Sequence, residues 1–106
     1  MKALKIEIDD PSTGAVAGLH VIGSYTVDVT AKFCQSHIHG FVSAKALADG
    51  KRAVGIRHVT VPGLPGEGDD PMTWIYTRLA IPADDAARAH PAYQPSPFVG
   101  AELVEV

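Results

Sequence analysis

The chain has a single cysteine, Cys34, and no stretch of about 20 apolar residues, the length that spans a bilayer. One cysteine excludes an intramolecular disulfide. The opening residues, MKALKIEIDD, reach acidic side chains before the apolar core of a signal peptide could form. We therefore expect a soluble protein that is made in a cytoplasm and has no membrane partner.

Positive charge is scarce and scattered along the chain. Nine Lys and Arg residues stand against 12 Asp and Glu residues, which gives a net charge of −3 at pH 7. Only Lys51 and Arg52 are adjacent. Because nucleic-acid binding needs a basic stripe that neutralises phosphates, we expect no nucleic-acid partner.

The common catalytic and cofactor motifs are absent from the sequence. It contains no nucleophile elbow, phosphate loop, dinucleotide fingerprint or zinc-type cysteine pair. The acidic clusters Glu67-Asp69-Asp70 and Asp84-Asp85 are explained by turn formation and helix starts. We therefore expect a protein that is not an enzyme, and we assign no catalytic, cofactor-binding or metal-binding residue.

The size and patterning that remain are those of one small β domain. The 106 residues, 46% of them hydrophobic and 20% charged, suit a single domain over residues 1–106. Alternating apolar residues predict a strand at Ala3–Ile8, and β-branched residues predict another at Ala53–Val61. The segment Phe98–Val106 is interpreted as a closing strand.

The run Ser24–Ser43 alternates between apolar and polar residues for most of its length, but the parity slips past Phe33. A slip requires a turn or a bulge, and about twenty residues is too long for one strand. We therefore predict a hairpin that turns near Thr30–Phe33, with its second strand at about Cys34–Val42. Cys34 is interpreted as a small strand residue.

Four further segments complete the prediction. Ser43–Gly50 has a serine N-cap and a glycine stop, which predict a helical turn, and Pro82–His90 is interpreted as a short helix. The loop Pro62–Pro71, rich in proline and glycine, is expected to be irregular and exposed. Met72–Ile81 is apolar on both parities and is interpreted as a central or interface strand. The predicted fold class is mainly β: a small antiparallel β-sandwich or partly closed barrel with one or two short helices.

His37 and His39 are the nearest approach to a chemical signal. Residues two apart on a strand point to the same face, and two neutral imidazoles can share a metal ion. The pair resembles the histidine pair of cupins, which implies a small metal-binding barrel enzyme. His58, on another predicted strand, and His20 are the candidates to complete such a site, if the tertiary structure brings them to the pair. In cupins a glutamate follows the pair, whereas this chain continues GFVSAKALADGK. The other interpretation places both histidines on the outer face of a sheet.

The order of the segments YTVDVTAKF, SAKALADGK, RAVGIRHVTVPG, WIYTRLAI and FVGAELVEV is similar to that of small structural proteins of tailed phages and prophages. In those proteins a β-sandwich or barrel-like module serves in a tail, baseplate or head. The resemblance is one of layout and transfers no functional residue. It implies a non-enzymatic virion protein, made in a bacterial host, that associates with copies of itself as a homo-oligomer and with neighbouring virion proteins. A cytoplasmic adaptor that binds a peptide at a strand edge is a further alternative.

Overall fold

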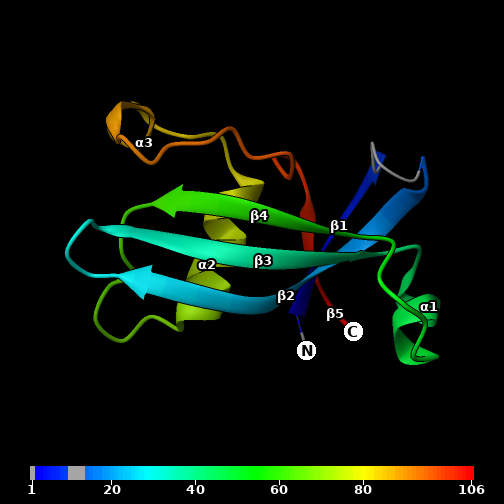
Figure 1. Ribbon diagram of the computed structural model, residues 1–106. Coiled ribbons are helices and arrows are strands. Elements are labelled where there is room, and N and C mark those ends of the chain that lie inside the picture. The colour runs from blue at the N-terminus through cyan, green and yellow to red at the C-terminus, as the bar shows by residue number, and fades with distance from the viewer. Residues whose placement is uncertain (1, 10–13) are drawn as a thin grey trace.

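The computed structural model describes residues 2–9 and 14–106 and shows an open, five-stranded antiparallel sheet (Figure 1). The strands lie in the order β4-β3-β2-β1-β5. They are β1 (Lys2–Asp9), β2 (Val16–Asp28), β3 (Phe33–Phe41), β4 (Gly55–Pro62) and β5 (Glu102–Glu105), and the helices are α1 (Ala44–Ala48), α2 (Pro71–Ala80) and α3 (Asp85–Ala89). The predicted class, a mainly β antiparallel fold with short helices, is confirmed. The sheet is not closed into a barrel.

The hairpin of β2 and β3 forms where the parity slip predicts it. The chain turns at residues 29–32, where Lys32 adopts a φ of 60° and its N–H donates to the Asp28 carbonyl over 2.9 Å. A second irregularity lies inside the hairpin, because the pairing register shifts between Ile22 and Ser24. The extra residue there is Gly23, and the His39 ring lies so close to it that an added side chain would clash with the imidazole.

The prediction of a strand over Met72–Ile81 is wrong, because this segment forms α2. Its buried residues Ile75, Tyr76 and Leu79 follow the i, i+1, i+4 spacing of one helix face. Such a stripe places apolar residues at both odd and even positions. The same pattern therefore resembles a strand that is buried on both sides.

The residues just before this segment start the helix. The Asp70 carboxylate accepts a hydrogen bond from the Thr73 backbone N–H over 3.1 Å, as an N-cap residue does. Pro71 occupies the first turn, where its missing N–H costs nothing. Both residues were included in the predicted loop Pro62–Pro71, and their capping role is the signal that distinguishes helix from strand here.

The remaining predicted elements are found with shifted ends. Ser43 caps α1 by accepting from the Ala46 N–H over 3.2 Å, and α3 lies inside the predicted helix Pro82–His90. The closing strand is shorter than predicted, because only Glu102–Glu105 pairs with β1. Phe98 is instead fully buried in the core, and Gly100, with a φ of 90°, turns the chain toward β5. No helix in the described residues is long and apolar enough to cross a bilayer.

The main core lies between α2 and one face of the sheet, as the helix behind the strands in Figure 1 shows. Its buried members are Leu4, Ile22, Cys34, Ile38, Val59, Val61, Ile75, Tyr76, Leu79 and Phe98. We call the face that they occupy the inner face. A second, smaller cluster shares no residue with this core. It consists of Ala3, Leu19 and Val21, with Phe41, Leu47 of α1 and Val104 packed against them.

The Tyr76 hydroxyl ties α2 to two strands. It accepts a hydrogen bond from the Ile22 N–H over 2.7 Å and donates one to the Lys2 carbonyl over 3.0 Å. Because the register shift at Gly23 interrupts the ladder beside Ile22, the phenol supplies the acceptor that the backbone needs. Burial raises the pKa of the Tyr76 hydroxyl, so the group stays neutral and able to donate.

Replacing Tyr76 with Phe should destabilise the fold. The change leaves the buried Ile22 N–H and the partly buried Lys2 carbonyl without this partner, which costs about 1–3 kcal/mol of unfolding free energy for the buried N–H. Tyr93→Phe is the matched control, because the Tyr93 hydroxyl makes no hydrogen bond to the described residues. Urea unfolding of both variants measures the difference, and equal stabilities would contradict the role given to Tyr76.

Candidate functional site

His37 and His39 lie on the outer face of the sheet, as the second interpretation of the sequence expected. Their neighbours Ser36, Ile38 and Gly40 are buried on the inner face of β3. His37 stands opposite His58 of β4, and the two rings stack with centroids 4.1 Å apart and planes at 16°. The sheet register therefore brings together two histidines that are 21 positions apart in the chain.

The other two candidate ligands are placed differently. The His39 ring lies against Gly23 of β2, and His20 is buried in the inner face. Among the residues 2–9 and 14–106, no group of three His, Cys, Asp or Glu side chains is placed to hold a metal ion. The structure thus assembles the pair His37 and His58 without a third ligand from those residue types.

His20 is a buried histidine of the inner face. Its side chain is 2% exposed and stands edge-on to the Phe98 ring, with the centroids 4.9 Å apart. Nε2 lies 2.9 Å from the Ile6 carbonyl, which assigns the proton to Nε2 because a carbonyl only accepts. A Cβ at Gly40 would lie 3.4 Å from Nδ1 and only 3.0 Å from the Ala17 Cβ, so glycine makes room for the ring.

The burial of His20 should make the fold sensitive to acid. Desolvation lowers the pKa of His20 below 6.5, so the unfolded chain binds a proton in a pH range where the folded chain does not. Stability contributed by neutral His20 should therefore be lost as pH falls below about 6.5, until the folded pKa is reached. The Asp70 carboxylate, whose pKa hydrogen bonds from Thr73 hold below 3.8, titrates below this window.

Urea unfolding between pH 7 and pH 5 measures this dependence. We expect His20→Gln to reduce the slope of unfolding free energy against pH, because the buried titrating group is gone. The control Val29→Gln changes a side chain that is 71% exposed and introduces no titrating group, so it should keep the slope of the unaltered protein. Two identical slopes for His20→Gln and the unaltered chain would refute the assignment.

Cys34 lies in β3, as predicted for a small strand residue, and the structure places it in the core. Its side chain is fully buried, and Sγ lies 3.7 Å from the Gly63 carbonyl, to which it donates. Burial raises the pKa of the thiol, which keeps it protonated. A structural role explains these contacts.

The two edge strands of the sheet, β4 and β5, have different surroundings. Along β4 runs the segment 91–99, which we call the arm, and Gln94 of the arm accepts from the outward-facing Thr60 N–H over 3.0 Å. The arm therefore lies alongside the edge strand β4, as Figure 1 shows, and occupies one of its outward N–H groups. At the opposite edge, β5 pairs with β1 and has no second strand neighbour in the described part of the chain.

A wide groove lies beside the β5 edge. Val42 lines it and is 58% exposed, and Leu103 of β5, which pairs with Leu4, is 39% exposed at the same edge strand. The groove is lined by Lys5, Ile6, Glu7, Gly18, Leu19, Val42, Ser43, Ala44, Gly100, Glu102, Val104, Glu105 and Val106. It combines apolar side chains with side chains of both signs of charge.

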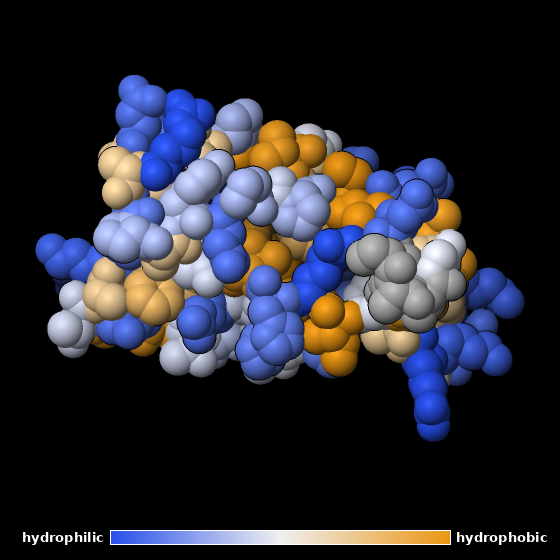
Figure 2. All heavy atoms as spheres, turned by 45° about the horizontal axis from the view of Figure 1, so that its top comes forward, coloured by the Kyte–Doolittle hydropathy of each residue, from blue (hydrophilic) through white to orange (hydrophobic). Residues whose placement is uncertain are grey.

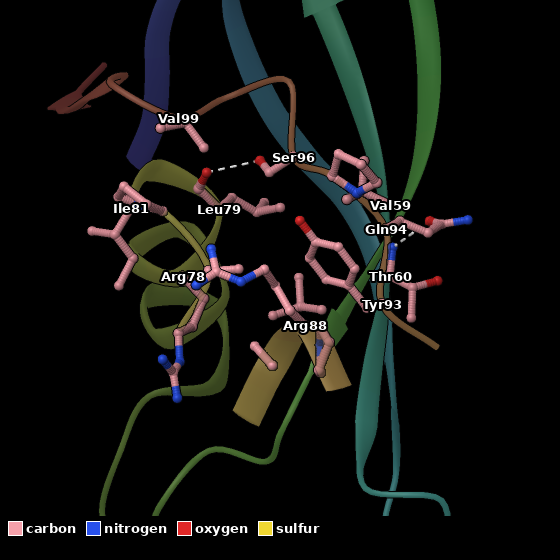
Figure 3. Close-up of a pocket in the computed structure, with 16 residues that line it drawn as sticks. Val59, Thr60, Arg78, Leu79, Ile81, Arg88, Tyr93, Gln94, Ser96 and Val99 are labelled. Atoms are coloured by element: carbon pink, nitrogen blue, oxygen red, sulfur yellow. Dashed lines mark hydrogen bonds between the residues drawn. The ribbon is translucent and has the colours of Figure 1, made fainter. Parts of the chain in front are cut away.

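A separate pocket of about 250 Å³ opens on the β4 side, between β4, the end of α2, α3 and the arm (Figure 3). Arg78, Arg88 and Tyr93 line it from three different segments; the Arg88 and Tyr93 side chains point into the space, whereas the Arg78 guanidinium turns away from it. The sequence analysis missed them, because it treated Arg78 as a strand residue and had no reason to join it to α3 or to the arm. The helical register of α2 places Arg78 at the pocket, and the positions of α3 and the arm beside it add Arg88 and Tyr93.

Comparisons with known proteins give no identification. No protein-family model matches the chain. No curated protein and no solved structure matches it either.

Proposed function

We propose that the protein is a non-enzymatic assembly protein that acts through protein–protein association at the β5 edge of its sheet. The observation that carries the proposal is the contrast between the two edges. Gln94 occupies an N–H group of the β4 edge and the arm lies alongside it, whereas β5 has β1 as its only strand neighbour in the described residues. An exposed edge strand of a sheet is a template for pairing with a strand of another chain.

Pairing of β5 with β5 of a second copy would extend the sheet across a two-fold axis. With Val104 opposite its own counterpart, the faces of the two sheets match, because antiparallel partners share a side. Leu103 and Val104 would lose exposed apolar surface. Association also suits a chain of 106 residues, since a small domain buries a limited share of its own surface.

The groove beside β5 supplies the rest of the contact. Four strand residues are fewer than a stable interface needs, which is about 800 Å² on each partner. Val42 and Ser43, which follow β3, and Gly18 of β2 extend the surface from β5 toward α1. Lys5 and Glu7 on β1 provide charges of opposite sign that can pair across a two-fold axis.

A lysine at Leu103 or at Val42 should dissociate the assembly. Each change places a charge in the proposed contact and should raise the dissociation constant at least about tenfold, since an unpaired buried charge is costly. Val29→Lys is the control, because Val29 is 71% exposed at the opposite end of the hairpin. Light scattering coupled to size exclusion measures the mass of each variant.

The expected result is an oligomer for the unaltered chain and for Val29→Lys, and smaller species for Leu103→Lys and Val42→Lys. Circular dichroism checks that each variant is folded. A monomer of the unaltered chain at 100 μM would reject self-association at this edge.

We further propose that the assembly is part of a phage or prophage particle. The support is the layout of strands, turns and the proline-rich arm that resembles small phage structural proteins. One part of that layout changes, because WIYTRLAI belongs to α2 and its flanking residue rather than to a strand. The two-layer arrangement of a small sheet and a helix still suits repeated packing in a shell or tube.

Particle membership is tested by mass spectrometry of purified particles. After prophage induction of the host that carries the gene, the chain should purify with the particles at a constant ratio to the major structural proteins. Its presence only in the particle-free supernatant would refute the virion role. That result would not affect the oligomeric state measured by light scattering.

A further inference from the structure

We propose that the pocket between β4, α2, α3 and the arm binds a small carboxylic acid with an apolar body. The proposal does not depend on association at β5, because the pocket opens beside β4 at the other edge of the sheet. Figure 2 turns the top of the view in Figure 1 toward the reader. Hydrophobic residues gather in the middle of that face, with hydrophilic residues around them.

The walls of the pocket are largely apolar. Val61 of β4, Leu79 at the end of α2 and Ile81 after it line the space, and the arm adds Val99. The volume of about 250 Å³ corresponds to roughly eight water molecules, at ~30 Å³ each. It lies just under the ~300 Å³ at which pockets for drug-sized ligands begin. A single ring or a short branched chain with one head group therefore fits, and a longer peptide does not.

The charged side chains that line the pocket favour a negatively charged ligand. Arg78 and Arg88 line the pocket, and no Asp or Glu is among the described residues that do so. Their acidic partners Asp84 and Asp85 lie outside the lining. The chain as a whole has a net charge of −3, so two arginines at one cavity stand against the general charge of the protein.

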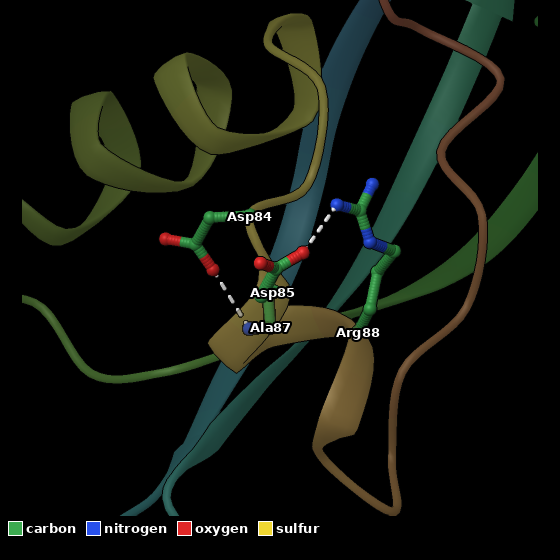
Figure 4. A network of polar contacts seen from close by, with 4 residues as sticks. All are labelled: Asp84, Asp85, Ala87 and Arg88. Atoms are coloured by element: carbon green, nitrogen blue, oxygen red, sulfur yellow. Dashed lines mark hydrogen bonds and ion pairs between the residues drawn. The ribbon is translucent and has the colours of Figure 1, made fainter.

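Arg88 is the anchor for the carboxylate. Figure 3 shows its side chain extended across the pocket toward the end of α2. One nitrogen, Nη2, donates to Asp85 over 2.7 Å (Figure 4), and a guanidinium has five N–H donors in all. The Asp85 side chain is fully exposed, so water screens this ion pair. The remaining N–H groups can form the charge-assisted hydrogen bonds that carboxylates favour.

Tyr93 and Arg78 complete the polar part of the site. The Tyr93 hydroxyl points into the pocket and makes no hydrogen bond to the described part of the chain, so it can donate to a second carboxylate oxygen. Arg78 contributes charge at the rim, because its guanidinium carbon lies 5.3 Å above the Trp74 ring and Nη1 lies 3.9 Å from Asp84.

The pocket is built before any ligand arrives. Ser96 Oγ donates to the Leu79 carbonyl over 2.8 Å, and Gln94 accepts from Thr60, which fastens the arm to α2 and to β4. The Gly100 N–H donates to the Ala80 carbonyl over 2.9 Å and holds the far end of the arm. A preformed cavity avoids the ordering cost that weakens binding to mobile surfaces.

The test uses two probes of equal shape, 3-phenylpropanoate and the uncharged 3-phenylpropanamide. Titration into the ¹⁵N-labelled full chain, followed by amide chemical shifts, should show saturable changes at pocket residues such as Thr60, Ala87 and Val99. The acid should bind at least about tenfold more tightly than the amide, because only the carboxylate forms charge-assisted hydrogen bonds with Arg88.

Three variants separate the proposal from nonspecific binding. Arg88→Met should remove the preference for the acid while the amide binds as before, and Arg52→Met, which changes an exposed arginine away from the pocket, should keep the preference. Ala87→Trp fills the cavity and should abolish both. The proposal is overturned if neither probe saturates at millimolar concentration, if acid and amide bind equally to the unaltered chain, or if Arg88→Met keeps the preference.

Discussion

The packing of α2 across the inner face of the sheet is the constraint on which the rest of the structure depends. Ile75, Tyr76 and Leu79 bury that face, and the Tyr76 hydroxyl joins the helix to β1 and β2 at the point where a bulge interrupts the ladder. Without this layer a single open sheet would expose its apolar side to water. The helix also directs its end toward β4 and so creates one wall of the pocket beside the arm.

The two edges of the sheet then take different roles. The arm lies alongside β4 and is joined to it through Gln94, and the space left between arm, helix end and strand is the cavity that Arg88 and Tyr93 enter. The β5 edge has no such cover in the described residues and carries apolar side chains beside a groove. We infer that a ligand site and an association surface are separated by the width of the sheet, so that one can be altered without the other.

Local signals predicted much of this fold. The alternation over Ala3–Ile8, the parity slip past Phe33 and the serine before α1 each depend on near neighbours in the chain, and each element forms where expected. The prediction of a strand over Met72–Ile81 was wrong because an apolar helix face and a strand that is buried on both sides give similar sequence patterns. The Asp70-Pro71 start was available in the sequence and would have distinguished them.

The sequence by itself determined the class of the fold, the hairpin and the shared face of His37 and His39, because side-chain direction on a strand follows from its period of two. Only the tertiary structure decided that His37 meets His58, that His20 is buried, and that Arg78 and Arg88 share a pocket with Tyr93. Those neighbours come from segments far apart in the chain. Their meeting depends on strand register and on the packing of α2, which no local pattern encodes.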